Sequence, residues 1–419
     1  MGPEMERCAN DMVFTSFNKA PRVLHVLKTS DGAEWAALQV TELVRSGIEV
    51  HVVLPSAAGR MLPLWQESGA TIHTAVIDWT VQTVAAWPKV KRAISTLVGD
   101  LKPDLIHSHF LSSTVLLRRA LGVKSRIPRL FQVPGPLHLE YDILRRAELM
   151  TAGPLDCWIA SSRCILNHYQ TAGVPENRLF LSYYGTNVNT FHTERTGYLR
   201  RKLRLDDHTI IVGNANYIYP PRRYLGQKVG LKCHEDIIDA LGTVIQQKDD
   251  VVGVLIGGTF AGSGEYERQL RARAAAVGGD RIIMTGYMPG AEVRQAWSDF
   301  DLAIHVPLSE NCGGVLEPML SGVPVIAGQV GGLPEIVMEG VSGSTVPIQR
   351  PDLLARCILD VLASPDRYQV YARNGQRLAR QMFSVERTAR EIFQIYQFIL
   401  GRANCAPPRF DARTWKDGE

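Results

Sequence analysis

The sequence predicts an α/β protein of two doubly wound domains, each with a parallel sheet between layers of helices. Three observations support this fold class. Short apolar runs that suit buried strands alternate with longer stretches of helical periodicity. The chain has 419 residues, which is too long for one ordinary core and suits two domains. A turn-rich stretch (184–191, YGTNVNTF) and the charged run 195–207 place a linker near residue 190.

The first half opens with a strand–turn–helix–strand unit. Its parts are a strand at 22–28 (RVLHVLK), a turn at 29–32, a helix at 33–46 and a strand at 49–55. Further strands are expected at 70–73, 105–107, 129–133, 157–160 and 178–182, with helical patterns between most of them. The first turn holds one glycine, Gly32, so the dinucleotide signature GxGxxG is absent. A nicotinamide dehydrogenase is therefore disfavoured.

The stretch 81–101 predicts one long amphipathic helix that carries Lys89, Lys91 and Arg92 near one another. A solvated basic face is the favoured interpretation of these residues. The alternative is docking on an anionic membrane surface.

The second half repeats the alternation of strands and helices. Strands are expected at 209–214, 251–256, 281–285, 302–306 and 323–327, and helices at 235–248, 266–277, 291–298, 351–364 and 384–400. We therefore divide the chain into a mobile leader (1–20), a first domain (21–192), a second domain (193–383) and a tail (403–419). The helix 384–402 is expected to join the first domain.

Composition narrows the class of protein. A formal charge of +4 with scattered Lys and Arg gives no reason to expect nucleic acid as a partner. Seven cysteines without a CxxC pair favour a reducing compartment over a disulfide or zinc framework. The chain has no run of 18 apolar residues, and its first residues lack an apolar signal core. We expect a cytoplasmic protein.

The stretch 309–345 (SENCGGVLEPMLSGVPVIAGQVGGLPEIVMEGVSGST) carries the strongest chemical signal. Glu310 follows a strand, Gly313 and Gly314 open what we expect to be a helix, and Glu317 lies inside it. Free N–H groups at such a helix start suit phosphate or sugar oxygens, and carboxylates accept hydroxyl hydrogen bonds from a polyol. A glycine-capped structural helix with a solvated glutamate is the alternative, and both carboxylates together with a second glycine pair disfavour it.

This block resembles the carboxylate–glycine–carboxylate signature of family-four glycosyltransferases. The resemblance covers residues 21–400, and TSDGAEWAALQVTEL and FQVPGPLHLE are similar to a bacterial subgroup of polysaccharide assembly and natural-product glycosylation. It implies the GT-B architecture, two Rossmann-like doubly wound domains that face each other across a cleft. One departure is that six residues separate Glu310 from Glu317, where the family usually has seven.

The resemblance implies roles for the donor side of the site. Glu310 matches the glutamate that bonds the donor sugar, Glu317 the one that holds the ribose, and Lys232 the lysine of the diphosphate. The family also has a cation that partners this lysine. Arg223 is the first choice for it here, with Arg222 and Lys228 as alternatives. The remaining donor contacts expected are Gly32, Gly258, Cys312, Gly313, Gly314 and Val315.

A departing nucleoside diphosphate gains negative charge, and paired cations stabilise that charge most in the transition state. This chemistry favours a role for Lys232 and its arginine partner, although the four cations in residues 222–232 would also suit a solvated basic loop.

The first domain is expected to supply the acceptor side. His109, in LIHSHF, matches the family's histidine near the 6-hydroxyl of the sugar, whereas His107 is expected to bond internally. Trp35, His138 and Glu140 are candidates for acceptor binding, and for the last two a structural turn is an equal alternative.

Metal chemistry is disfavoured. Asp299-Phe300-Asp301 spells a DxD pattern, but it ends a helix and starts a strand, which favours a structural role. We expect no metal site and no cofactor.

Together with these residues, the resemblance implies a retaining, metal-independent hexosyltransferase with a UDP- or GDP-sugar as co-substrate. Its acceptor would be a small molecule or a lipid-linked glycan. Two alternatives stay open, a nucleotide-sugar epimerase and a non-catalytic nucleotide-sugar binding protein. Peripheral contact with the inner membrane face and the oligomeric state also stay open.

Overall fold

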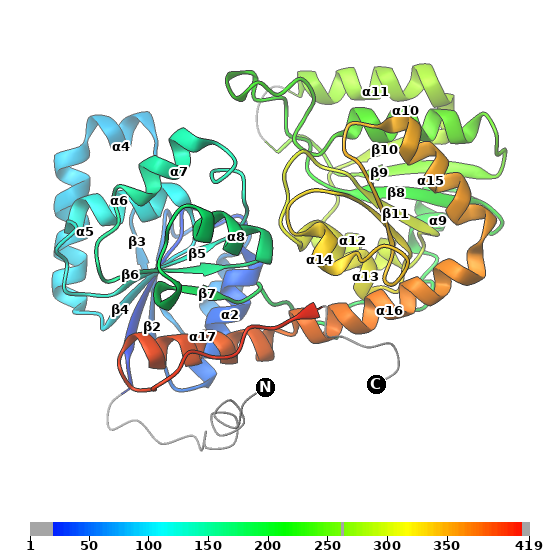
Figure 1. Ribbon diagram of the computed structural model, residues 1–419. Helices are drawn as coiled ribbons and strands as arrows, with labels where there is room; N and C mark the ends of the chain where they lie inside the picture. Colours follow the sequence, from blue (N-terminus) through cyan, green and yellow to red (C-terminus); the bar gives the residue numbers. More distant parts are fainter. Residues whose placement is uncertain (1–19, 261–263, 413–419) are drawn as a thin grey trace.

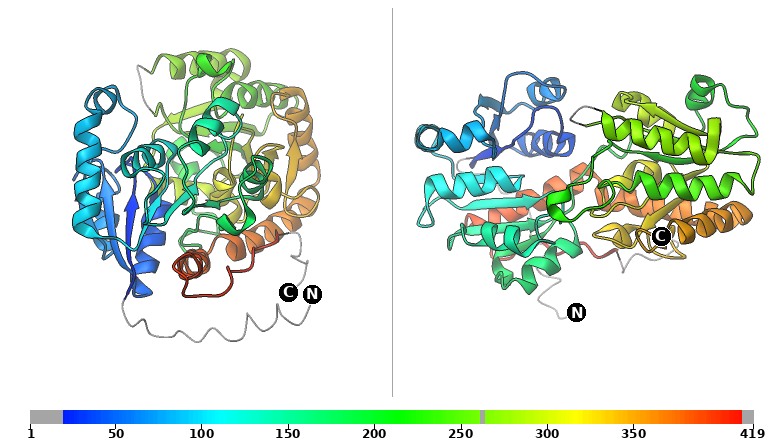
Figure 2. Two further views of the ribbon diagram at one scale, coloured as in Figure 1. Left: turned by 60° about the vertical axis from the view of Figure 1, so that its left-hand side comes forward. Right: turned by 90° about the horizontal axis from the view of Figure 1, so that it is seen from above.

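The computed structural model describes residues 20–260 and 264–412, and it contains two parallel β-sheets, each within its own α/β domain (Figure 1). The predicted fold class is therefore confirmed. Seen from above, the two domains lie side by side (Figure 2). Residues 1–19 of the predicted leader and 413–419 of the predicted tail lie outside the described residues.

The first sheet has the strand order β3-β2-β1-β4-β5-β6-β7, with every neighbouring pair parallel. Its strands are β1 (Arg22–Val26), β2 (Glu49–Leu54), β3 (Thr71–Thr74), β4 (Leu105–Ser108), β5 (Arg129–Val133), β6 (Asp156–Ala160) and β7 (Leu179–Leu181). The central strands are buried on both faces, as continuous apolar runs predict for a parallel sheet.

The second sheet repeats this arrangement in the order β10-β9-β8-β11-β12-β13, again parallel throughout. Its strands are β8 (Ile210–Ala215), β9 (Val251–Ile256), β10 (Ile282–Gly286), β11 (Leu302–His305), β12 (Val325–Gly328) and β13 (Ser344–Val346). In both sheets the strand order reverses beside the first strand, between β1 and β4 and between β8 and β11. Ligands of such sheets bind outside the carboxyl ends of the strands at this switch point.

Helices cover both faces of each sheet. Those of the first half are α2 (Glu34–Arg45), α3 (Leu62–Glu67), α4 (Val81–Ala85), α5 (Trp87–Leu101), α6 (Leu111–Leu121), α7 (Asp142–Leu149) and α8 (Arg163–Thr171). Those that follow are α9 (Tyr198–Leu203), α10 (His234–Ile245), α11 (Glu265–Gly278), α12 (Gly290–Trp297), α13 (Leu316–Leu320), α14 (Leu333–Ile336), α15 (Pro351–Ala363), α16 (Pro365–Phe383) and α17 (Val385–Ile399). The described residues also form the short 3-10 turns η1 (Glu176–Arg178), η2 (Arg223–Leu225), η3 (Gly279–Arg281) and η4 (Gly313–Val315).

The chain crosses back to the first domain at its end. Helix α16 lies along the second domain, and α17 continues beneath the first, where it packs against α2 (Figure 1). At the junction, the Thr186 N–H donates to Phe383 O at 2.8 Å and the Val385 N–H donates to Thr186 O at 3.0 Å. A Cβ on Gly185 would lie 2.5 Å from Val385 Cα, so the linker needs a glycine where it meets this junction.

One sequence-based expectation about the helices is wrong, and one helix was not predicted. The stretch 81–101 forms two helices, α4 and α5, because Pro88 favours a new helix start at its own first turn. The 19-residue helix α16 was not expected at all, since its sequence is rich in polar residues and contains Gly375. That glycine lets the helix approach Ser342 closely, because a Cβ there would lie 2.9 Å from Ser342 O. Among the described helices, none is long and apolar enough to cross a membrane.

Candidate active site

The carboxylate of Glu310 is the centre of a charged group at the carboxyl end of β11. The Lys232 ammonium donates to its Oε2 oxygen, and His305 Nε2 lies 3.0 Å from the same oxygen. The backbone N–H of Asn311 donates to Oε1 at 3.0 Å. Burial favours the protonated acid, but the Lys232 charge and the His305 hydrogen bond outweigh burial and hold the pKa of Glu310 well below its usual range. Glu310 is therefore ionised at neutral pH.

A second glycine pair supports the backbone of Glu310. The Gly332 N–H donates to Glu310 O at 3.3 Å. Gly331 has a φ of +58°, and a Cβ on it would lie 1.7 Å from the same carbonyl. The loop before α14 can approach Glu310 this closely only because it carries glycine there.

Glu317 lies in α13 and interacts with Trp297 at the end of α12. The indole Nε1–H donates to Glu317 Oε2 at 2.9 Å. Burial raises the pKa of Glu317 and the indole hydrogen bond opposes that rise. The carboxylate has further acceptor capacity beyond this one hydrogen bond, as the predicted contact with a ribose diol requires.

The glycine loop between the two glutamates differs from the helix start that we expected. Gly313 to Val315 form the turn η4, and α13 after it has only five residues. The dipole of so short a helix is small, so any contact with an anion rests on individual N–H groups. Cys312 and Val315 are fully buried, and Gly313 is exposed.

The four cations of the basic loop before α10 lie in different settings. Lys232 reaches Glu310, whereas Arg223 in η2 and Lys228 are exposed and Arg222 is half-buried. The structure therefore joins Lys232 to the predicted donor group. The identity of the arginine that partners Lys232 stays a prediction.

The remaining expected donor contacts are two glycines. A Cβ on Gly32 would meet no other atom within 4 Å, so the protein itself does not demand glycine there. Gly258 is buried, and a Cβ on it would lie 3.1 Å from the backbone nitrogen of Tyr287.

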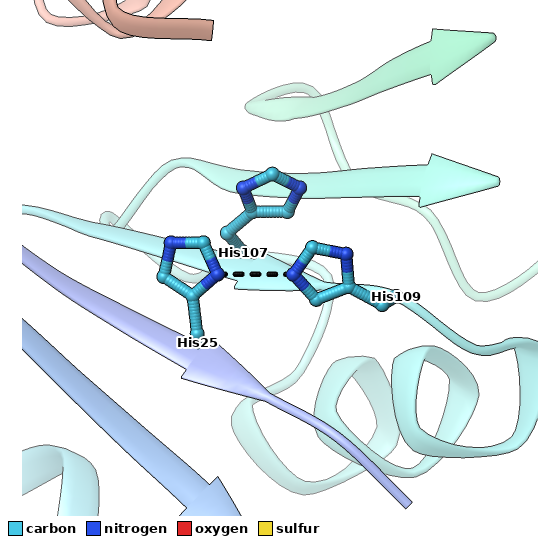
Figure 3. A group of neighbouring side chains, drawn as sticks. All are labelled: His25, His107 and His109. Carbon is cyan, nitrogen blue, oxygen red and sulfur yellow. Dashed lines mark hydrogen bonds between the residues drawn. The ribbon is translucent and has the colours of Figure 1, made fainter. Parts of the chain in front are cut away.

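In the first domain, His109 belongs to a fully buried group of three histidines (Figure 3). Its Nε2 lies 3.0 Å from His25 Nδ1, and its Nδ1 lies 3.4 Å from the hydroxyl of Tyr184. Burial lowers the pKa of His109 well below its usual value, so its ring is neutral. Both nitrogens are engaged inside the domain, and the predicted contact of His109 with a sugar stays a prediction.

His107 completes this group through the C-terminal helix. The hydroxyl of Tyr396, on α17, lies 2.6 Å from His107 Nδ1 and 3.1 Å from His25 Nε2. The histidines therefore link the two central strands of the first sheet to α17.

The ring geometry of the three histidines is that of a hydrogen-bonded stack. A metal ion binds imidazole in the plane of the ring. His25 and His109 point their nitrogens at each other, and the His107 ring lies over the pair with interplanar angles of only 38° and 23° (Figure 3). The in-plane lone pairs of His107 therefore do not converge with those of the other two rings. The hydrogen bonds among these rings and with Tyr396 account for their arrangement, and the expectation that no metal binds here stays a prediction.

The expected acceptor residues lie in different settings. The ring of Trp35 is half-buried and lies 3.8 Å from that of Tyr184 and 5.5 Å from that of His109, between ring centres. His138 is buried with its Nε2 3.3 Å from the hydroxyl of Tyr169, and burial lowers its pKa to about 3. Glu140 accepts a hydrogen bond from Ser309 of the second domain at 2.9 Å.

The DxD pattern has structural partners. Asp299 accepts from the backbone N–H groups of Gly197 and Leu199 at the start of α9, each at 2.7 Å. Asp301 accepts from the Ile211 N–H at 2.8 Å. Both carboxylates hold backbone groups of the second domain in place.

The two domains meet beside Glu310. The carboxylate of Glu335, in α14, accepts from the N–H groups of Arg163 (2.9 Å) and Cys164 (2.8 Å) at the start of α8, and from the Tyr183 hydroxyl (2.8 Å). Asn311 Nδ2 donates to Ser161 Oγ at 2.9 Å. The loop that carries Glu310 is thus fastened to the first domain.

Sequence reasoning missed two residues of this site, His305 and Glu335. His305 is the last residue of β11, five positions before Glu310, and Glu335 follows the second glycine pair. For His305 the available signal was a polar side chain at a strand end before a glycine-rich motif, and for Glu335 it was a carboxylate three residues after a glycine pair.

Comparison with known proteins identifies the family. The model described as "Glycosyl transferases group 1" matches residues 223–378, and "Glycosyltransferase Family 4" matches residues 31–190. The two matches divide most of the chain between them, one to each domain. The chain belongs to the group 1, family-four glycosyltransferases. The family predicted from the sequence is thereby confirmed, and the protein is an enzyme of sugar transfer.

Individual relatives of this glycosyltransferase are distant. A D-inositol 3-phosphate glycosyltransferase of Segniliparus rotundus is 26% identical over 88% of this chain and 84% of its own. The Anabaena protein HepE, in complex with UDP and glucose, superimposes with a TM-score of 0.75 at 21% identity, over 90% of this chain and 99% of its own. A UDP-N-acetylglucosamine 2-epimerase gives 0.60 at 14% identity, over 94% and 100%. These structures share the GT-B fold with this chain.

Proposed function

We propose that this glycosyltransferase moves a hexosyl group from UDP- or GDP-sugar to a hydroxyl acceptor, with retention of anomeric configuration. The observation that carries the proposal is the contact between Lys232 and Glu310 at the switch point of the second sheet. It places a cation suited to a diphosphate beside an ionised carboxylate suited to sugar hydroxyls. UDP and glucose in the complex of the similarly folded HepE support a nucleotide-sugar donor.

The donor side follows from these groups. Lys232, together with Arg223, would stabilise the charge that develops on the leaving diphosphate, and such a donor is worth about 3 kcal/mol in the transition state. Glu310 would accept a hydroxyl of the transferred sugar and Glu317 the ribose diol. Backbone N–H groups of residues 312–315, with Gly32 and Gly258, would complete the contacts.

The acceptor is proposed to bind the first domain near Trp35, with His109, His138 and Glu140 as the candidate polar contacts. Its class is a lipid-linked saccharide or a small metabolite, as in exopolysaccharide or natural-product assembly. The names of two relatives support hydroxyl acceptors of these kinds, one a D-inositol 3-phosphate glycosyltransferase and one a lipopolysaccharide core biosynthesis mannosyltransferase of Rhizobium leguminosarum.

The test starts from binding and proceeds to turnover. The melting temperature of the protein is measured with UDP, GDP, ADP and TDP, because a ligand that binds only the folded state raises it. Transfer is then measured with sugars of the nucleotide that binds. Glu310→Ala and Lys232→Ala should each lower kcat by about 100-fold or more. Full transfer rates in both variants would show that the site is assigned wrongly.

A nucleotide-sugar epimerase is the second candidate, because enzymes of that class share the fold. It would convert the donor without an acceptor. Product analysis with the donor alone separates the two functions, since a transferase needs the acceptor for a new glycosidic product. A non-catalytic binding protein would give a thermal shift and no product at all.

We also propose that transfer needs no metal ion or cofactor. The two DxD carboxylates are occupied by backbone N–H groups, which supports this proposal. Transfer rates should stay unchanged in the presence of EDTA. A loss of activity that added Mg²⁺ or Mn²⁺ restores would contradict the proposal.

Peripheral contact with an anionic membrane is proposed for the region of α4 and α5, in a cytoplasmic enzyme. Trp79 and Val84 are 43% and 66% exposed, close in sequence to the exposed Lys89, Lys91 and Arg92. Apolar and basic side chains together suit such a surface. Co-sedimentation with phosphatidylglycerol vesicles should fall when Trp79→Ser and Lys91→Glu are combined, and equal co-sedimentation would contradict the contact.

A further inference from the structure

Three side chains from two strand ends form a short hydrogen-bonded chain that ends on Glu310. Asn216 follows β8 and His305 closes β11 in the neighbouring position of the sheet. Asn216 Nδ2 lies 3.3 Å from His305 Nδ1, and His305 Nε2 lies 3.0 Å from Glu310 Oε2. His305 is only 3% exposed, so the protein rather than water sets its hydrogen bonds.

The partners of His305 define one tautomer. An ionised carboxylate only accepts hydrogen bonds, so Nε2 of His305 must carry the proton that faces Glu310. In a neutral imidazole the other nitrogen is then an acceptor, and the amide N–H₂ of Asn216 is the donor that it requires. Burial lowers the pKa of His305 even though Glu310 opposes that effect, which agrees with a neutral ring.

His305 and Lys232 hold the same oxygen of Glu310 but differ in mobility. Lys232 has a flexible stem, and its charge is also suited to the diphosphate of a donor. The His305 ring is enclosed and fixed by a second hydrogen bond. If Lys232 turns to the diphosphate, the histidine remains as the donor on Oε2, while Asn311 N–H remains on Oε1.

The glycine loop is built against the same ring. A Cβ on Gly314 would lie 1.9 Å from His305 Nε2 and 2.4 Å from Cε1. Any side chain at this position would therefore displace the imidazole from Glu310. The same contact places the backbone of this loop directly on the ring. It is the loop between Glu310 and Glu317, which has six residues where the family usually has seven.

We infer that His305 is a positioning residue, which aligns the Glu310 carboxylate with a hydroxyl of the transferred sugar, and that Asn216 fixes its tautomer. This inference rests on the proposed function, because it takes the ligand of Glu310 to be the sugar of a nucleotide sugar. It assigns His305 no contact with the substrate.

The experiment compares His305→Gln with His305→Leu. A glutamine amide places an N–H donor close to where His305 has Nε2–H, whereas leucine removes the donor and keeps an apolar volume. We expect His305→Leu to lower kcat/KM for transfer by 10- to 100-fold and His305→Gln to retain at least a third of the wild-type value. Asn216→Leu should fall between them. His73→Leu, a half-buried histidine of the first domain that hydrogen-bonds to His51, is the control and should keep wild-type kinetics.

Binding separates positioning from a general loss of structure. The dissociation constant of the nucleoside diphosphate alone should change by less than about twofold in His305→Leu, while that of the intact nucleotide sugar should rise at least fivefold, because Glu310 would contact only the sugar. Equal losses for both ligands, or glutamine as harmful as leucine, would show that His305 only maintains the fold. Transfer at the wild-type rate in His305→Leu would overturn the inference alone. A wild-type protein that binds no nucleotide sugar would overturn the proposed function and the inference together.

Discussion

At the scale of single residues, Gly313 and Gly314 show that adjacent glycines serve different ends. The sequence presents them as one pair at the start of a helix. In the structure, Gly314 is closed in by the His305 ring, whereas Gly313 has no other atom within 4 Å of a would-be Cβ. Packing therefore demands glycine at position 314, whereas no neighbouring atom of the described residues demands it at position 313.

This difference predicts unequal effects of a single methyl group. Gly314→Ala should destabilise the protein by about 1–3 kcal/mol, because the methyl group has to displace a buried ring or the backbone. Gly313→Ala should change the free energy of unfolding by less than about 0.5 kcal/mol. Chemical denaturation of both variants measures this directly. Equal stability of the two would mean that the loop is not packed on His305.

At the scale of elements, Glu335 acts as an N-terminal cap for a helix of the other domain. It lies in α14 and accepts from the first N–H groups of α8, which would otherwise have no partner within their own helix. This contact joins the two domains together with the hydrogen bonds from Asn311 to Ser161 and from Ser309 to Glu140. It also joins α14 to the first domain. This helix follows the glycine pair that contacts the backbone of Glu310.

Removal of that carboxylate should therefore lower the free energy of unfolding and let the two domains move apart. We expect Glu335→Ala to cost about 0.5–2 kcal/mol, the usual cost of losing a helix cap. Small-angle scattering should show a larger radius of gyration than in the wild type. Glu265→Ala, which removes an exposed carboxylate from α11, is the matched control and should change neither value. An unchanged radius in Glu335→Ala would show that other contacts suffice to hold the domains.

The elements also show what a sequence can predict. Strands of a parallel sheet are buried on both faces, so β1, β8 and β11 stand out as apolar runs without knowledge of the fold. Helix α16 was missed because a polar helix with an internal glycine lacks that signal, and its place depends on Ser342 and Met319 in distant segments.

The same reasoning applies to the site. The motif pattern singled out Glu310 and Lys232, which the structure joins. It did not single out Asn216 or Glu335, whose partners lie on another strand or in the other domain, nor His305, which joins Asn216 on another strand to Glu310. Contacts of this kind are set by strand order and domain packing, which no local spacing encodes.

At the scale of the whole molecule, buried neutral histidines couple stability to pH. Burial lowers the pKa of His25 and His138 to about 3 and that of His234 to about 4, and it lowers those of His107 and His109 well below their usual value. The unfolded chain binds a proton at each of these rings near pH 6.5, whereas the folded protein does not.

The stabilisation that these neutral histidines provide should therefore be complete above about pH 6.5. The free energy of unfolding should fall as the pH drops from there toward 4, because the unfolded state then binds more protons than the folded state. Each such histidine contributes up to about 1.4 kcal/mol per pH unit. Asp236, whose pKa burial raises to about 6, acts in the opposite direction, as do Glu140, Glu317, Glu335 and Glu391, whose pKa values burial also raises. The net slope is therefore smaller than the histidines alone would give. Denaturant titrations at pH 7.5, 6 and 5 measure the slope, which His138→Gln should flatten by one histidine's share. The comparison with His138→Gln isolates one ring. The same slope in this variant and in the wild type would show that His138 binds a proton as readily in the folded protein as in the unfolded chain, and would contradict a neutral buried ring.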